Sequence, residues 1–103
     1  MSGTRSSTVI FRKKGETVIR RIAGETLLVP LRGDVVLLQK LFVLNPGAEV
    51  IWDKLDGRTE LGTIAAVLAD RFGIAPDQAA ADTRDFIQEL LTEGLVEEVA
   101  LPG

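Results

Sequence analysis

The sequence contains neither cysteine nor histidine in its 103 residues. The absence of both residue types excludes disulfides, thiolate nucleophiles, imidazole bases and the common zinc sites. A Ser-His-Asp triad is excluded for the same reason. A magnesium or calcium site built only from carboxylates stays open, but no EF-hand spacing of carboxylates is present. We therefore expect no catalytic residue, no metal ligand and no cofactor in this chain.

Aromatic residues and long apolar runs are also scarce. Trp52 is the only tryptophan, and tyrosine is absent. No run of about 18 apolar residues exists, so no membrane-spanning helix is expected. Residues 1–8 lack the basic-then-apolar order of a signal peptide. These features predict a cytoplasmic protein that has no membrane partner.

The hydrophobic residues of the chain suffice for one apolar core, and its charged residues are distributed unevenly. Hydrophobic residues make up 46% of the chain, whose length is typical of a single domain. Residues 5–21 hold six basic residues and one acid, whereas residues 76–98 hold one arginine and seven acids. Solvated surface is the ordinary interpretation of both runs.

The first part of the chain has the pattern of strands. β-Branched residues and uneven alternation predict strands over residues 17–23 and 26–31, joined by a turn at Gly24-Glu25. A third strand is predicted at about 40–44, with a less certain extended piece over 35–40 before it. Residues 1–15 contain only a short apolar piece at Val9-Ile10-Phe11, so a flexible N-terminal arm with at most one short extended piece is expected there.

The second part has the 3.6-residue period of helices. Caps, prolines and glycines predict three of them, which lie between Asn45 and Gly57, between Thr59 and Gly73, and between Pro76 and Gly94. Phe72 ends the apolar stripe of the second helix, and Leu91 ends that of the third. Residues 95–99 alternate and predict a short final strand.

This order of elements predicts an α+β fold. A small antiparallel sheet packed on a three-helix bundle is winged helix-turn-helix-like in its parts. We place the domain at residues 16–99, after the arm at 1–15 and before a C-terminal tail at 100–103.

An ordered set of short motifs resembles the PqqD-like family, which is named for a small protein of pyrroloquinoline quinone biosynthesis. The resemblance covers roughly residues 17–97. Its motifs, in chain order, are Leu28-Val29-Pro30-Leu31-Arg32-Gly33, Leu44-Asn45-Pro46-Gly47-Ala48, Ile51-Trp52, Leu55-Asp56-Gly57 with Thr59 and Ile64, and Asp82, Phe86, Leu90 and Gly94-Leu95.

The resemblance implies a binding role. Members of the family are peptide chaperones for ribosomally made, post-translationally modified peptides, with a three-stranded sheet packed on three helices. The leader segment of the precursor peptide adds as an extra strand beside the third strand and lies against the third helix. The module then presents the peptide to a modifying enzyme, often a radical S-adenosylmethionine (SAM) protein, whose iron–sulfur cluster this cysteine-free chain could not bind.

Strand addition requires a free strand edge and pockets for alternate side chains. The candidate strand is Leu41, Phe42, Val43 and Leu44, in which alternation places Leu41 and Val43 on one face and Phe42 and Leu44 on the other. On the third helix, Phe86 and Leu90 lie one turn apart, as do Ile87 and Leu91. The sequence leaves open which of these residues line a groove and which are core.

Three acids share one side of the third helix. Asp82, Asp85 and Glu89 are spaced at i, i+3 and i+7, so they could meet a basic residue of a leader peptide. A solvated helix face explains the same spacing.

Two other functions and two oligomeric states stay open at this point. A winged-helix DNA-binding regulator is one alternative, and a small enzyme that uses paired carboxylates is another, although no motif singles out such a pair. An exposed strand edge would also permit self-association, so the sequence allows both a monomer and a homodimer.

The charge of the helices predicts that this protein does not read DNA. A recognition helix needs basic and amide side chains, but the third helix carries one arginine among its acids. We expect no sequence-specific duplex binding, and at most a weak contact through the basic arm that fades with salt. Footprinting at physiological salt checks this, and a sequence-specific footprint would establish the DNA-binding alternative.

Overall fold

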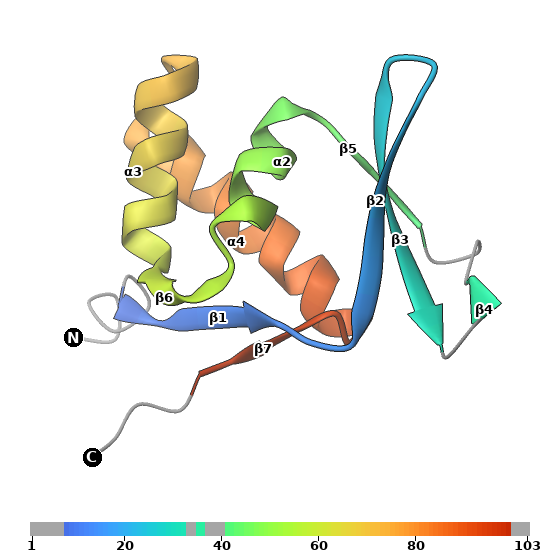
Figure 1. The fold of residues 1–103 in the computed structure, drawn as a ribbon. Coiled ribbons are helices and arrows are strands. Elements are labelled where there is room, and N and C mark those ends of the chain that lie inside the picture. The colour runs from blue at the N-terminus through green and yellow to red at the C-terminus, as the bar shows by residue number, and fades with distance from the viewer. Residues whose placement is uncertain (1–7, 33–34, 37–40, 100–103) are drawn as a thin grey trace.

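The computed structural model describes residues 8–32, 35–36 and 41–99. Figure 1 shows the helices on one side of the molecule and a long β-hairpin on the other. In chain order the elements are β1 (Ile10–Lys13), β2 (Glu16–Ile22), β3 (Glu25–Arg32), β4 (Val35–Val36), β5 (Phe42–Leu44), α2 (Pro46–Asp53), β6 (Asp56–Glu60), α3 (Leu61–Phe72), α4 (Pro76–Thr92) and β7 (Val96–Glu98).

The strands form two antiparallel sheets. One sheet has the order β6-β1-β7, and in the other β3 pairs with β2 on one side and with β4 and β5 on the other. The sequence predicted a single three-stranded sheet, so this part of the prediction needs correction. The short strands β1, β6 and β7 make a sheet of their own because segments far apart in the chain complete one another's backbone hydrogen bonds.

The N-terminal arm predicted at residues 1–15 extends too far. Residues 10–13 form β1, the middle strand of its sheet, and Phe11 is buried there. The apolar piece Val9-Ile10-Phe11 is only three residues long. Its local sequence therefore could not predict that β1 pairs with β6 and β7. The predicted C-terminal tail and residues 37–40 of the predicted extended piece lie outside the described residues.

The β2–β3 hairpin turns one residue earlier than predicted. Ile22 pairs with Glu25, so the turn residues are Ala23 and Gly24, whose φ angles are 53° and 80°. A two-residue turn with both φ angles positive matches the right-handed twist of the strands it joins. Arg21 and Thr26, which pair across this hairpin, both donate hydrogen bonds to the carboxylate of Glu49 on α2, at 2.9 and 3.0 Å. The hairpin is therefore tied to the first helix.

The segment between α2 and α3 is a strand built on an aspartate turn. The carboxylate of Asp56 accepts hydrogen bonds from the backbone N–H groups of Arg58 and Thr59 and from the Thr59 hydroxyl. The hydrogen bond from Arg58 contributes most to lowering the pKa of Asp56. The carboxylate therefore stabilises the fold above its ordinary pKa, and this contribution is lost as the pH falls. Thr59, predicted to cap the second helix, instead serves this turn, and α3 begins after Glu60 without a side-chain cap.

One apolar core joins both sheets to the helices. It includes Leu28 of β3, Phe11 of β1, Val96 of β7, Ile64 of α3 and Leu90 of α4. On α4 the buried face is Ala79, Thr83, Ile87 and Leu90, and the Thr83 hydroxyl donates to the Ala79 carbonyl at 2.7 Å. This internal bond leaves no polar atom of Thr83 unpaired in the core.

In the residues that the structure describes, the prediction of an α+β fold with three helices is confirmed, together with the ends of the second helix at Gly73 and of the third near Gly94. The likeness to a winged helix-turn-helix stays a prediction. None of the described helices is long and apolar enough to cross a bilayer.

Neighbouring leucines on α4 test where the core ends. Leu90 is fully buried, whereas Leu91 is 36% exposed although the sequence placed both on the apolar stripe. Leu90→Ala should lower the free energy of unfolding by about 2–5 kcal/mol, the usual cost of a cavity in a packed core. Leu91→Ala should cost much less. Chemical denaturation of both variants measures the difference, and equal losses would contradict this assignment of the core.

A groove between β5 and the helices

The junction between β5 and α2 is only one residue long. That residue, Asn45, accepts a hydrogen bond from the Ala48 N–H through its side-chain Oδ1 at 2.8 Å. Pro46 follows in the first turn, where its missing N–H costs nothing. The cap and the proline together fix the direction in which the chain leaves the strand, so the angle between β5 and α2 is set locally.

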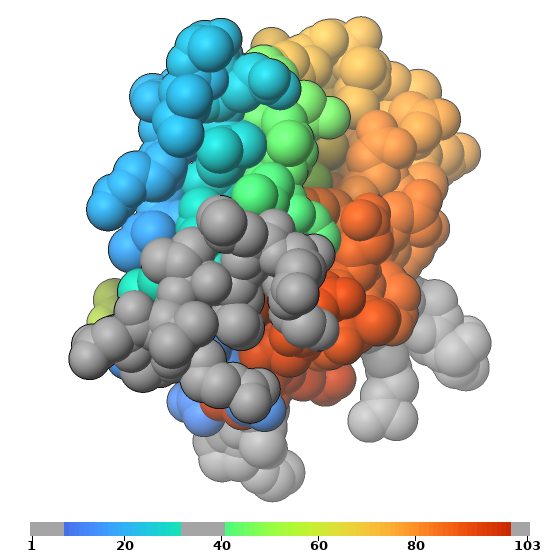
Figure 2. Space-filling model, turned by 90° about the vertical axis from the view of Figure 1, so that its right-hand side faces the viewer, coloured from blue at the N-terminus to red at the C-terminus, as the bar shows by residue number. Residues whose placement is uncertain are grey.

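A groove of about 410 Å³ lies between β5 and the helices. In Figure 2 the green surface of β5 and α2 lies beside the orange surface of α4. Residues from β5, α2, α3, α4 and their junctions line the groove: Phe42, Val43, Asn45, Gly47, Ala48, Ile51, Leu68, Phe72, Ile74, Asp82, Asp85, Phe86 and Glu89. Residues of strand β5 and of the helices thus line the same space, as a site for an extended peptide requires.

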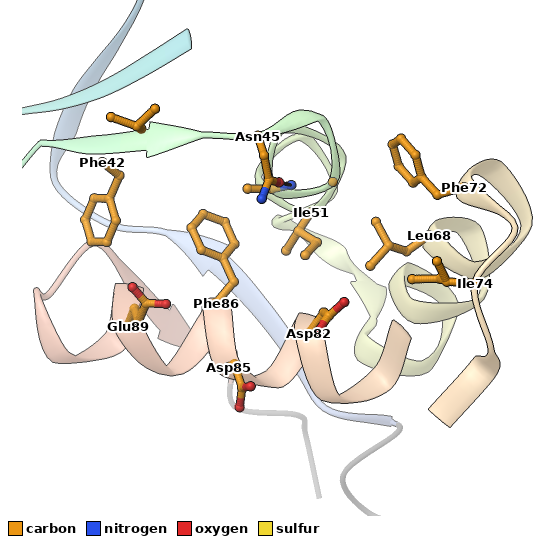
Figure 3. A pocket seen from close by; sticks show the side chains of 13 residues that line it. Phe42, Asn45, Ile51, Leu68, Phe72, Ile74, Asp82, Asp85, Phe86 and Glu89 are labelled. Atoms are coloured by element: carbon orange, nitrogen blue, oxygen red, sulfur yellow. Dashed lines mark hydrogen bonds between the residues drawn. The ribbon is translucent and has the colours of Figure 1, made fainter. Parts of the chain in front are cut away.

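An aromatic pair forms one end of the groove. Phe42 of β5 and Phe86 of α4 meet edge to face, with ring centroids 6.3 Å apart and an angle of 86° between the rings. Figure 3 shows the two rings side by side, while Leu68, Phe72 and Ile74 gather at the other end. The groove therefore has apolar side chains at both ends.

Acidic side chains supply the charge of the groove. Among the residues that line it, Asp82, Asp85 and Glu89 are acidic and none is basic. The Gln78 amide donates to Asp82 Oδ1 at 2.7 Å, and this neutral donor leaves the carboxylate charge in place. The two ion pairs that the structure describes, Arg12 with Glu97 and Arg21 with Glu49, lie elsewhere. The groove consequently presents a negative rim to any ligand.

Six of the nine residues predicted for peptide binding line this groove: Phe42, Val43, Asp82, Asp85, Phe86 and Glu89. Leu44 and Leu90 are core residues, with exposed fractions of 4% and 0%, so their side chains belong to the fold. Leu41 is half-buried and lies outside the lining. The question that the sequence left open for the strand and the helix is thereby answered in part: Phe86 faces the groove where Leu90 does not.

The first two helices contribute residues to the groove that the sequence did not predict. Asn45, Ala48 and Ile51 line the groove from α2 and its cap, and none of them was among the predicted binding residues. Phe72 was placed on a buried stripe, yet it is 41% exposed and lines the groove with Ile74. The sequence contained one signal for this exposure: Phe72 is a large aromatic residue directly before Gly73, the glycine that ends the helix.

A family model described as "Coenzyme PQQ synthesis protein D (PqqD)" matches residues 16–96. The match spans most of the chain. The protein belongs to the PqqD family. The resemblance drawn from the sequence motifs is thus confirmed, and membership implies a role in recognising precursor peptides alongside modifying enzymes. Neither a curated protein nor a solved structure matches the chain.

The aromatic pair should couple β5 to α4 energetically. Edge-to-face pairs contribute about 0.5–1.5 kcal/mol beyond the area that they bury. A double-mutant cycle with Phe42→Leu and Phe86→Leu should therefore give a coupling of that size in the free energy of unfolding. The pair Phe72 and Phe86 offers a control, because both line the groove but lie in different parts of it. A Phe42–Phe86 coupling no larger than that of the control would mean that the contact does not hold the two elements together.

Proposed function

We propose that this protein binds the leader segment of a ribosomally made precursor peptide by strand addition at β5. In this proposal it presents the peptide to a modifying enzyme, a radical SAM protein, and itself catalyses no reaction. The expected cytoplasmic location belongs to the same proposal, and the oligomeric state stays open between monomer and homodimer.

One observation carries the proposal: the groove adjoins a strand that has a single partner among the described strands. β5 pairs with β3 alone, through the register Thr26 with Leu44, Leu27 with Val43 and Leu28 with Phe42. In an antiparallel ladder the backbone groups of a strand alternate between its two sides. Some N–H and C=O groups of β5 therefore point away from β3, toward the side on which a peptide strand would add.

The chemistry of the groove supports an extended peptide as the ligand. A strand that adds to β5 gains affinity from backbone hydrogen bonds and specificity from pockets for alternate side chains. The apolar floor from Ile51 and Leu68 and the aromatic wall from Phe86 supply such pockets. The part of the chain that the structure describes offers no corresponding support for the DNA-binding alternative, because α4 carries Arg84 among four acids.

Backbone spectroscopy tests where the peptide binds. The ligand for this measurement is the leader segment of any precursor-like open reading frame that sequencing of the neighbouring genes identifies. We expect this leader to shift the amide resonances of residues 41–44 and of α4, and to protect the β5 amides from hydrogen exchange. Tight binding that perturbs only the N-terminal arm or the outer face of α3 would contradict strand addition.

Side-chain truncation tests which residues hold the leader. Phe86→Ala and Val43→Ala should each weaken binding by about 1–3 kcal/mol, the range of a moderate interface anchor. Asp85→Lys should cost only about 0.2–1 kcal/mol, because a single exposed charge pair contributes little. Calorimetry measures these affinities, with melting curves to verify the fold. The proposal fails if Asp85→Lys abolishes binding while both folded apolar variants bind as the wild type does.

A further inference from the structure

The acidic residues of α4 flank an aromatic residue that faces the groove. Asp82, Phe86 and Glu89 are spaced at i, i+4 and i+7, which places them on one side of the helix. Figure 3 shows Asp82 near Leu68 and Ile74 and Glu89 near Phe42, with Phe86 between the two acids. Asp85 also lines the groove but points away from β5 in this view.

The same-sign charges on this face have no cation beside them in the groove lining. Like charges three or four residues apart on a helix repel one another, and Asp82, Asp85 and Glu89 make two such pairs in succession. The hydrogen bond from Gln78 orients Asp82 without neutralising it. A ligand that brings positive charge would relieve this repulsion, whereas an acidic ligand would increase it.

The spacing of these side chains suits a strand with alternating basic and apolar residues. Asp82 and Glu89 lie seven residues apart on the helix, which corresponds to about 10 Å along its axis. Side chains on one face of a strand recur about every 6.7 Å. In a bound peptide, the residues two positions before and two positions after a central residue (−2 and +2) therefore lie roughly 13 Å apart. The long side chains of lysine and arginine bridge the remaining few ångströms, since their apolar stems pack on a surface while their charged ends reach outward.

We propose that the leader recognised by this protein carries a large apolar residue with lysine or arginine two positions away on each side. The apolar side chain packs beside Phe42 and Phe86, and the two basic side chains pair with Asp82 and Glu89. This inference rests on the proposed function, because it names the peptide class that the groove selects. The acidic pair acts on specificity, and the apolar contacts and the backbone ladder supply the larger share of affinity.

A display library of random 12-residue peptides tests the proposal, because the groove itself selects the sequences that it binds. Selection on the wild-type protein should enrich peptides that carry lysine or arginine at −2 and +2 around a large apolar residue. Selection on the Asp82→Lys/Glu89→Lys variant should enrich aspartate or glutamate at those positions instead. Asp70→Lys is the matched control, since it changes the same charge at an exposed position of α3 outside the groove lining. This control should keep the wild-type preference.

Affinities of a selected basic peptide give a quantitative readout. The double variant should bind this peptide about tenfold more weakly at low salt, because two exposed ion pairs are lost and replaced by repulsion. The ratio should shrink as salt is added, since screening weakens exposed charge pairs. The neutral variant Asp82→Asn/Glu89→Gln should fall between the two, which separates the effect of charge from that of side-chain shape.

The outcomes separate this inference from the function on which it rests. Selected peptides that perturb β5 and α4 but show no basic preference would overturn the inference and leave strand addition standing. A library that yields no groove-binding peptide would overturn both. A concentration-dependent dimer that the double variant abolishes would mean that a second copy, through its basic strand β2, occupies the groove, and would likewise overturn the proposal.

Discussion

The burial of one face of α4 is the constraint on which the rest of the structure depends. Ala79, Thr83, Ile87 and Leu90 insert into a core that also contains residues of both sheets and of α2 and α3. A helix buried along one stripe must turn its other residues elsewhere. The core fixes the rotation of α4 about its axis. This rotation alone directs Asp82, Phe86 and Glu89 to the groove side of the helix. The stability of the domain and the shape of the groove thus have the same origin.

The local signals of the sequence were sufficient for the helices and for much of the groove. Gly73, with φ of 63°, ends α3 where it was expected to, and Pro76 opens α4. The acids of α4 could be grouped from their spacing alone. In contrast, β1 and β6 could not be recognised, because short strands depend on partners distant in the chain. Phe72 and Ile74 were missed as lining residues because helical period alone does not show which part of a stripe a neighbouring helix leaves uncovered.

The family signature divides into residues that make the fold and residues that face the groove. Asp56 with Gly57 builds a turn in which a Cβ at position 57 would lie 3.4 Å from Arg12 Cβ, and Gly57 has a φ of 80°. Leu90 belongs to the core, while Asn45 both caps α2 and lines the groove. Most motifs that identify the family therefore preserve the scaffold. Of the signature residues on α4, Asp82 and Phe86 face the groove, and selectivity among peptides would reside in these positions together with Glu89.

The brevity of β5 limits how much of a bound peptide it can hold. Three strand residues span about 10 Å, so the ladder would cover only a few residues of the ligand. The remainder of a precursor would not be held by the protein, and it would move freely within the reach of its bound segment. The proposed module would then act through effective concentration: it would keep the reactive segment near the modifying enzyme without having to recognise that segment. Precursors with different reactive segments but the same short leader motif would then be handled alike.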